Sequence, residues 1–92
     1  MNHAGLTLTL LTRSCCHLCD EMLLAVKPLA AARGVAIAVV DVDGDPVLEA
    51  AYGDRVPVLF AGAPDVGIEL CHFRLDRARV DAVMAGSGRR AD

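Results

Sequence analysis

Aromatic residues are scarce in this sequence, which contains no Trp, one Tyr and two Phe among 92 residues. Hydrophobic residues nevertheless make up 54% of the chain, so a core can form, and it has to be built from aliphatic side chains and Met. No apolar run approaches the roughly 18 residues that a membrane-spanning helix requires. The length suits one domain. We therefore expect a single domain over residues 1–92 that does not associate with membranes.

Basic residues are also few, with 9 Lys and Arg against 12 Asp and Glu and a formal net charge of −3. They are spread along the chain apart from Arg89 and Arg90, whereas a nucleic-acid-binding domain presents a clustered basic face. The first residues lack the basic segment and the cleavage site of a signal peptide. We expect a cytoplasmic monomer that does not bind nucleic acid.

Cysteine is the informative residue, because three of the four cysteines lie close together, at Cys15, Cys16 and Cys19. A small secreted domain held by disulfides spreads its cysteines along the chain and has a weak core. This chain has neither property. In a reducing compartment such a cluster indicates chemistry rather than a structural cross-link.

Hydrophobic periodicity predicts the element order β-α-β-α-β-β-α. We expect strands at residues 6–12, 35–40, 56–60 and 67–72, helices at about 16–33, 46–52 and 76–85, and a frayed tail at residues 87–92. The first strand, helix and strand form a parallel crossover unit. The unbroken apolar run at 35–40 is typical of a central strand covered on both faces. The predicted architecture is an α/β fold with a four-stranded mixed sheet flanked by helices.

Cys16 and Cys19 form a C-x-x-C motif between the first predicted strand and helix. The N–H groups and the partial positive charge of a helix N-terminus stabilise a thiolate, which is the species that attacks a disulfide. We predict that Cys16 is the exposed nucleophile and that Cys19, on the apolar stripe of the helix, resolves the mixed disulfide. A charged His17 would favour the thiolate, and Asp20 would oppose it.

A C-x-x-C motif is also half of many zinc sites, and a second pair exists at Cys71 and His72. That pair lies on a predicted strand, where adjacent side chains point to opposite faces, whereas structural zinc sites use ligands from two loop knuckles. We therefore predict redox chemistry with no metal and no cofactor. A module that binds a metal or an iron–sulfur cluster through Cys16 and Cys19 is the alternative.

A proline opens the third predicted strand and completes a wider pattern with the upstream cysteines. This pattern covers residues 6–13, the Cys-His-Leu-Cys-Asp run at 16–20, and residues 40–43, 52–59 and 69–71. On these segments the chain resembles the glutaredoxin-like branch of the thioredoxin superfamily. The resemblance implies a thioredoxin-like fold, a thiol–disulfide oxidoreductase, and a cis Pro57 beside the cysteine pair. It also implies that the backbone of Val56 pairs with an extended substrate; we expect Val56, Pro57 and His17 to bind substrate.

The expected substrates are protein or small-molecule disulfides, and the expected reductant is a thioredoxin-type or glutathione system. Glutaredoxins carry paired glycines after the fourth strand that help to hold glutathione, whereas this chain has His72, Phe73 and Arg74 there. A glycine turn lets backbone donors approach a small anion closely. We therefore expect glutathione to be a poor reductant and a thioredoxin-type dithiol to serve better.

The two remaining cysteines have no assigned chemistry. Free Cys often packs as a small hydrophobic side chain, and we expect this of both Cys15 and Cys71. For Cys15, exchange with disulfides formed at Cys16 is the alternative.

Overall fold

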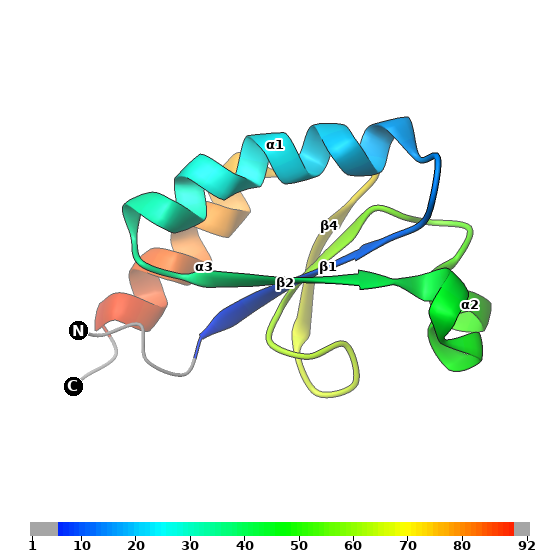
Figure 1. Cartoon of the computed structure of the whole chain (residues 1–92). Helices are drawn as coiled ribbons and strands as arrows, with labels where there is room; N and C mark the ends of the chain where they lie inside the picture. Colours follow the sequence, from blue (N-terminus) through cyan, green and yellow to red (C-terminus); the bar gives the residue numbers. More distant parts are fainter. Residues whose placement is uncertain (1–5, 90–92) are drawn as a thin grey trace.

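The structure of the protein is a computed structural model that describes residues 6–89. Its elements follow the predicted order (Figure 1): β1 Thr7–Thr12, α1 His17–Ala32, β2 Ala36–Asp41, a short 3-10 helix η1 Val42–Gly44, α2 Pro46–Tyr52, β3 Val58–Ala61, β4 Ile68–His72 and α3 Arg77–Arg89. The strand order is β2-β1-β3-β4, with β1 and β2 parallel and the other pairs antiparallel. The predicted α/β fold with a four-stranded mixed sheet is therefore confirmed.

Strand β1 is the centre of the fold, because its side chains are buried on both faces of the sheet. Leu8 and Leu10 belong to the main core with α1 and α3, whose other buried members are Met22, Val26, Ala30, Val35, Leu59, Leu70, Val80 and Met84. Leu11 points to the opposite face, as strand alternation requires, and joins a smaller core that α2 covers through Leu48 and Tyr52. Figure 1 shows α1 lying along the sheet and the short α2 at one end of it.

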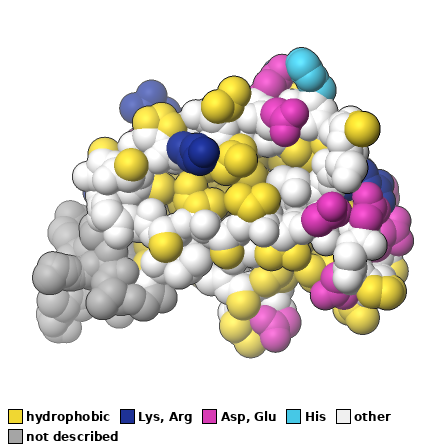
Figure 2. Space-filling view, viewed as in Figure 1, with side chains coloured by type: hydrophobic (Ala, Val, Ile, Leu, Met, Phe, Trp, Pro, Cys, Tyr) yellow, Lys and Arg dark blue, Asp and Glu magenta, His cyan; other side chains and the backbone are white. Residues whose placement is uncertain are grey.

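The prediction that residues 35–40 form a central strand is wrong, because β2 lies at an edge of the sheet. Most of its side chains are exposed, including Val39 with 51% of its surface accessible. The run is rich in small side chains such as Ala36 and Ala38, and leaving their small apolar surface in contact with water costs little free energy. Figure 2 shows apolar side chains exposed between α1 and β2 on this face.

The helix boundaries follow from local capping. Asp45 caps α2 by accepting hydrogen bonds from the amides of Val47 and Leu48 at 3.0 and 3.2 Å, as its place before Pro46 predicts. α1 ends before Gly34, whose φ of 69° lies in the left-handed region that favours glycine. The predicted boundaries of both helices are therefore correct to within a residue or so.

The last helix, α3, is longer than expected, since it continues to Arg89 rather than ending near residue 85. The first part of the tail predicted at 87–92 is therefore helical, and residues 90–92 lie outside the described part of the chain. Among the residues that the structure describes, every helix is too short or too polar to cross a bilayer.

Candidate active site

The candidate site lies at one end of the strands, where β1 ends, β3 begins and β4 ends. Leu11, near the end of β1, pairs with Val58 at the start of β3, and Val58 pairs with His72 at the end of β4. The segments that follow β1, precede β3 and follow β4 therefore lie next to one another. They contain the cysteine motif, Pro57 and Phe73, respectively.

Cys16 and Cys19 form a disulfide at the N-terminus of α1, with their Cα atoms 5.2 Å apart. Cys16 is the N-cap residue, and its Sγ accepts a hydrogen bond from the amide of Cys19 at 3.2 Å. Its carbonyl accepts the amide of Asp20, also at 3.2 Å. Cys19 is buried with 2% exposure, whereas Cys16 is half-buried. The two sulfur atoms thus have different environments, with Cys16 nearer to solvent and to the end of the helix.

His17, the first residue of α1, points into solvent. Its side chain is 89% exposed, and its Nε2 lies 3.6 Å from the Glu21 carboxylate one turn along the helix. The imidazole therefore interacts with a carboxylate as well as with water, which weakens any positive field that it would exert at Cys16. Asp20 is also exposed, so solvent screens the negative charge that would oppose a thiolate at Cys16.

Cys15 does not pack as a small hydrophobic side chain, so that prediction is wrong. It is a free, exposed thiol in the turn between β1 and α1, where its φ is 58°. The turn directs this side chain to solvent rather than into either core. Cys71 behaves as expected, because it packs partly against the main core. Burial raises the pKa of the Cys71 thiol.

The Val56–Pro57 peptide bond is cis. Pro57 is fully buried, while Val56 is half-buried and packs against the smaller core. The carbonyl of Pro57 accepts a hydrogen bond from the amide of Phe73 at 2.9 Å. This bond fixes the segment before β3 against the segment after β4.

Arg13 joins the loop before the cysteines to two other elements. Its guanidinium donates to the carbonyl of Gly53 at 3.0 Å, to Asp43 at 2.8 Å and to Glu49 at 3.2 Å. Hydrogen bonding to Asp43, followed by that to Glu49, raises the pKa of Arg13 above its ordinary value. Figure 2 shows the acidic side chains gathered over this end of the molecule. The sequence gives no signal for this link, because the partners are distant along the chain.

A second polar group surrounds Glu69 on β4. Nη1 of Arg55 lies 3.4 Å from the Glu69 carboxylate, and Nδ1 of His72 lies 3.1 Å from it. The Arg55 guanidinium also stacks over the ring of Tyr52 at 5.1 Å. Arg55 is therefore engaged by other groups of the protein.

Phe73 adopts a backbone conformation that glycine favours. Its φ is 66°, in the left-handed region that bulky residues avoid. Its ring is 44% exposed and makes an edge contact with the ring of His72, with centroids 4.9 Å apart. The turn after β4 is thus present, but aromatic side chains lie on it.

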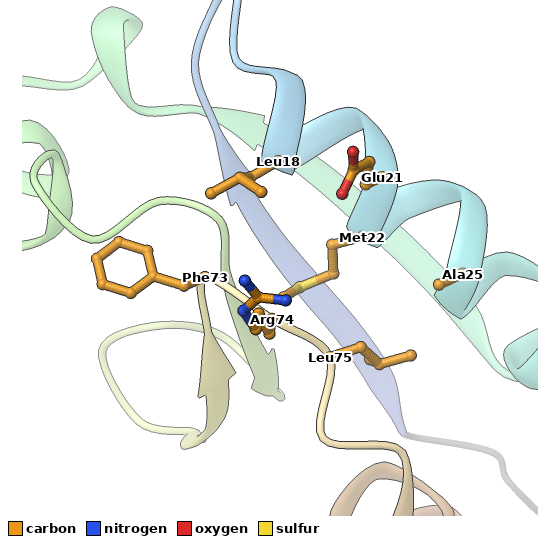
Figure 3. A pocket seen from close by; sticks show the side chains of 7 residues that line it. All are labelled: Leu18, Glu21, Met22, Ala25, Phe73, Arg74 and Leu75. Carbon is orange, nitrogen blue, oxygen red and sulfur yellow. The ribbon is translucent and has the colours of Figure 1, made fainter.

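A hollow of about 200 Å³ lies between α1 and the segment after β4; we call it the α1 hollow (Figure 3). Its lining residues are Leu18, Glu21, Met22, Ala25, Phe73, Arg74 and Leu75. Figure 3 shows Met22 on α1 and Arg74 on the segment after β4 among these residues. A second hollow, of about 440 Å³, lies along β4 and is lined partly by Cys71 and again by Arg74.

The site offers two sulfur ligands to a metal ion, from Cys16 and Cys19. Within residues 6–89, no group of three or more His, Cys, Asp or Glu side chains is arranged to hold one. The alternative of a metal or cluster module therefore gains no support from the geometry of the side chains.

Two solved structures are similar to this chain in sequence and in fold. The chain is similar to protein Ne2328 from Nitrosomonas europaea, with 37% identity, a TM-score of 0.73, and coverage of 85% of this chain and 89% of that one. It is also similar to protein XcR50 from X. campestris, with 41% identity, a TM-score of 0.63, and coverage of 87% and 97%.

Thioredoxin 1 from Thermosipho africanus shares the fold at 20% identity, with a TM-score of 0.60 and coverage of 86% of this chain and 90% of that one. No curated protein matches the chain significantly. The family model of the glutaredoxin-like domain (DUF836) matches residues 7–85, which include the cysteine motif, Pro57 and β4. The chain therefore belongs to the glutaredoxin-like family, and its fold is that of the thioredoxins.

Proposed function

We propose that this protein is a cytoplasmic thiol–disulfide oxidoreductase that acts on protein or small-molecule disulfides through Cys16 and Cys19. The observation that carries the proposal is the placement of the two sulfur atoms. They are bonded to each other at the N-terminus of a 16-residue helix, and only Cys19 is buried. The pair itself holds the two electrons that are exchanged, so the reaction needs no cofactor.

The reduced protein begins the reaction with Cys16 as a thiolate. Its sulfur attacks one sulfur of the substrate disulfide, a Cys16–substrate bond forms, and the other substrate sulfur leaves as a thiolate that takes a proton from solvent. Cys19 then loses its proton and attacks Cys16 Sγ, which releases the second substrate thiol. The substrate disulfide has gained two electrons and two protons, and the Cys16–Cys19 disulfide has formed.

The local backbone supports the role of Cys16 in this scheme. The Cys19 amide that donates to Cys16 Sγ, together with the unpaired amides of the first turn of α1, faces the charge of the thiolate. Cys19 is buried behind Cys16, where its sulfur reaches the mixed disulfide and is shielded from bulk solvent. Val56 precedes β3 and lies outside the strand ladder, which supports the proposed pairing of its backbone with an extended substrate.

A thioredoxin-type dithiol is the proposed electron donor. Glutathione is small and carries two carboxylates, which require close donors. Phe73 adds a large, partly exposed side chain to the turn after β4, which would keep backbone donors away from glutathione, and Arg55 already pairs with Glu69. A protein dithiol needs only access to the Cys16–Cys19 disulfide from solvent.

The test traps the intermediate. Cys19→Ser, incubated with a peptide disulfide, should accumulate a mixed disulfide on Cys16 that mass spectrometry detects, because the resolving thiol is missing. Cys16→Ser should form none. Cys15→Ser is the matched control, since it removes an exposed neighbouring thiol, and it should turn over like the parent protein. Full disulfide reductase activity in both Cys16→Ser and Cys19→Ser would show that the C-x-x-C motif is not the site.

A further inference from the structure

We propose that the α1 hollow is a docking subsite for a protein substrate whose segment near the disulfide carries an apolar side chain and a neighbouring acidic one, with Arg74 selecting the acid. This inference rests on the proposed disulfide exchange and names its substrate class. It is carried by the size of the hollow, by its lining, and by the unpaired charge of Arg74.

The hollow suits part of a larger molecule rather than a whole small one. Its volume of about 200 Å³ is below the roughly 300–1,000 Å³ typical of pockets that enclose a drug-sized ligand. One wall is a stripe of α1, with Leu18, Met22 and Ala25 on successive turns, and Leu75 faces it. Leu18 and Phe73 are exposed hydrophobic side chains at 41% and 44%. This lining favours an apolar side chain that reaches in from a bound segment.

The hollow adjoins the reacting atoms. In the sequence Leu18 lies between Cys16 and Cys19, in the first turn of α1. The amide of Phe73 donates a hydrogen bond to the carbonyl of Pro57. A substrate chain that presents its disulfide to Cys16 therefore passes the mouth of the hollow within a few residues. A residue close to the substrate cysteine is the one that the hollow would receive.

Arg74 supplies the charge that selects the substrate. Within the described residues, no carboxylate lies within 4.0 Å of its guanidinium. Nearby acids have other partners: Glu21 pairs with His17, and Glu69 with Arg55 and His72.

Asp76 accepts the amide of Arg79 at the start of α3, so it too has a partner of its own. Glu21 also lines the hollow, but its carboxylate pairs with His17 and, like those of the other described acids, lies more than 4.0 Å from the Arg74 guanidinium. The cation at the hollow is therefore left to pair with an acidic residue of the substrate.

The experiment measures peptide preference in the full protein. The probes are peptides with one intramolecular disulfide and one Leu, in which Asp or Lys occupies in turn each position up to four residues from either cysteine. For at least one position, kcat/KM should favour the Asp peptide over the Lys peptide by about two- to fivefold, the range expected for a partly exposed ion pair. Arg74→Glu should abolish or reverse that ratio.

Lys27→Glu is the matched control, because Lys27 is exposed on α1 and does not line the hollow, so it changes net charge equally and should leave the ratio intact. Bis(2-hydroxyethyl) disulfide, which is neutral and too small to reach the hollow, tests the exchange chemistry alone. If that compound is reduced while no position shows a preference, or if Arg74→Glu leaves the preference unchanged, the docking proposal is wrong and the proposed function stands.

A binding measurement separates docking from chemistry. In the Cys16→Ser/Cys19→Ser double variant, the preferred peptide with both cysteines replaced by Ser should shift the NMR signals of Leu18, Phe73 and Arg74, and its Lys counterpart should shift them less at equal concentration. Shifts confined to other surfaces would overturn the assignment, even if the peptide disulfide is reduced.

Discussion

Phe73 is the residue whose substitution tests the backbone and the chemistry of the site together. Its φ of 66° lies in the left-handed region, which costs a residue with a Cβ roughly 1–2 kcal/mol and which glycine adopts freely. Phe73→Ala keeps that cost and loses the edge contact with His72, a kind of contact worth about 0.5–1.5 kcal/mol. Phe73→Gly loses the same contact but relieves the backbone.

The two variants therefore differ in a predictable direction. Relief of roughly 1–2 kcal/mol exceeds the conformational entropy cost of glycine, about 0.5–1 kcal/mol. We expect Phe73→Gly to be more stable than Phe73→Ala by about 0.5–1 kcal/mol, which corresponds to a difference in Tm of roughly 2–8 °C for a domain of this size. Urea unfolding and thermal melts of the oxidised proteins measure both quantities.

Ala31 is the control position for this comparison. It is exposed within α1, where glycine is less favourable than alanine by about 1 kcal/mol, so Ala31→Gly should destabilise the protein. An alanine at position 73 that is as stable as a glycine there would refute the argument from φ. Phe73→Gly should also raise the rate at which glutathione reduces the oxidised protein, relative to the rate with thioredoxin. An unchanged ratio would show that the ring does not obstruct glutathione.

Three further predictions concern the core, pH and the cysteines. Leu10→Ala truncates a side chain with 0% exposure and should lower the free energy of unfolding by about 2–5 kcal/mol. Leu24→Ala, at a position with 72% exposure, should change the free energy of unfolding by less than about 0.5 kcal/mol. Urea unfolding compares the two variants, and equal effects would contradict the assigned core. Burial raises the pKa of the Cys71 thiol above its ordinary 9.0, so as the pH rises this thiol ionises in the unfolded chain before it ionises in the folded protein. The contribution of Cys71 to the free energy of unfolding is therefore fully present below about pH 9 and declines as the pH rises above it. Cys71→Ala should flatten that decline in unfolding free energy, and an unchanged slope would assign it to other groups. In the reduced protein, iodoacetamide should label Cys16 before Cys19, as mapped by mass spectrometry; the opposite order would reverse their roles.

The element order was predictable because each boundary carries a local signal. Asp45 followed by Pro46 begins α2, Gly34 ends α1, and alternating Leu and Thr mark β1. These signals act over a few residues, and the structure preserves them. The C-x-x-C motif was predictable for the same reason, since its spacing and its helix lie within one short segment.

Properties that depend on distant partners were not predictable in this way. The exposure of β2 depends on its place at the edge of the sheet, which an apolar run alone does not reveal. The group formed by Arg55, Glu69 and His72 requires β3 and β4 to pair with a register irregularity between Leu59 and Phe60. The left-handed φ of Phe73 contradicts its local preference and is held by the hydrogen bond to Pro57, which no sequence pattern indicates.

The same side chains that form the smaller core also determine how the site is assembled. Leu11 and Val58 are both fully buried in that core, and they are the pair that sets β3 against β1. A shift of β3 by one residue in this pairing would turn its side chains, including Val58, to the opposite face of the sheet, and this core would be lost. Because the cysteine loop follows Leu11 closely and Pro57 directly precedes Val58, that shift would also displace one from the other. Burial of aliphatic side chains at this end of the sheet therefore also sets the distance between the cysteine loop and Pro57, so the packing of the core and the geometry of the candidate site depend on the same residues.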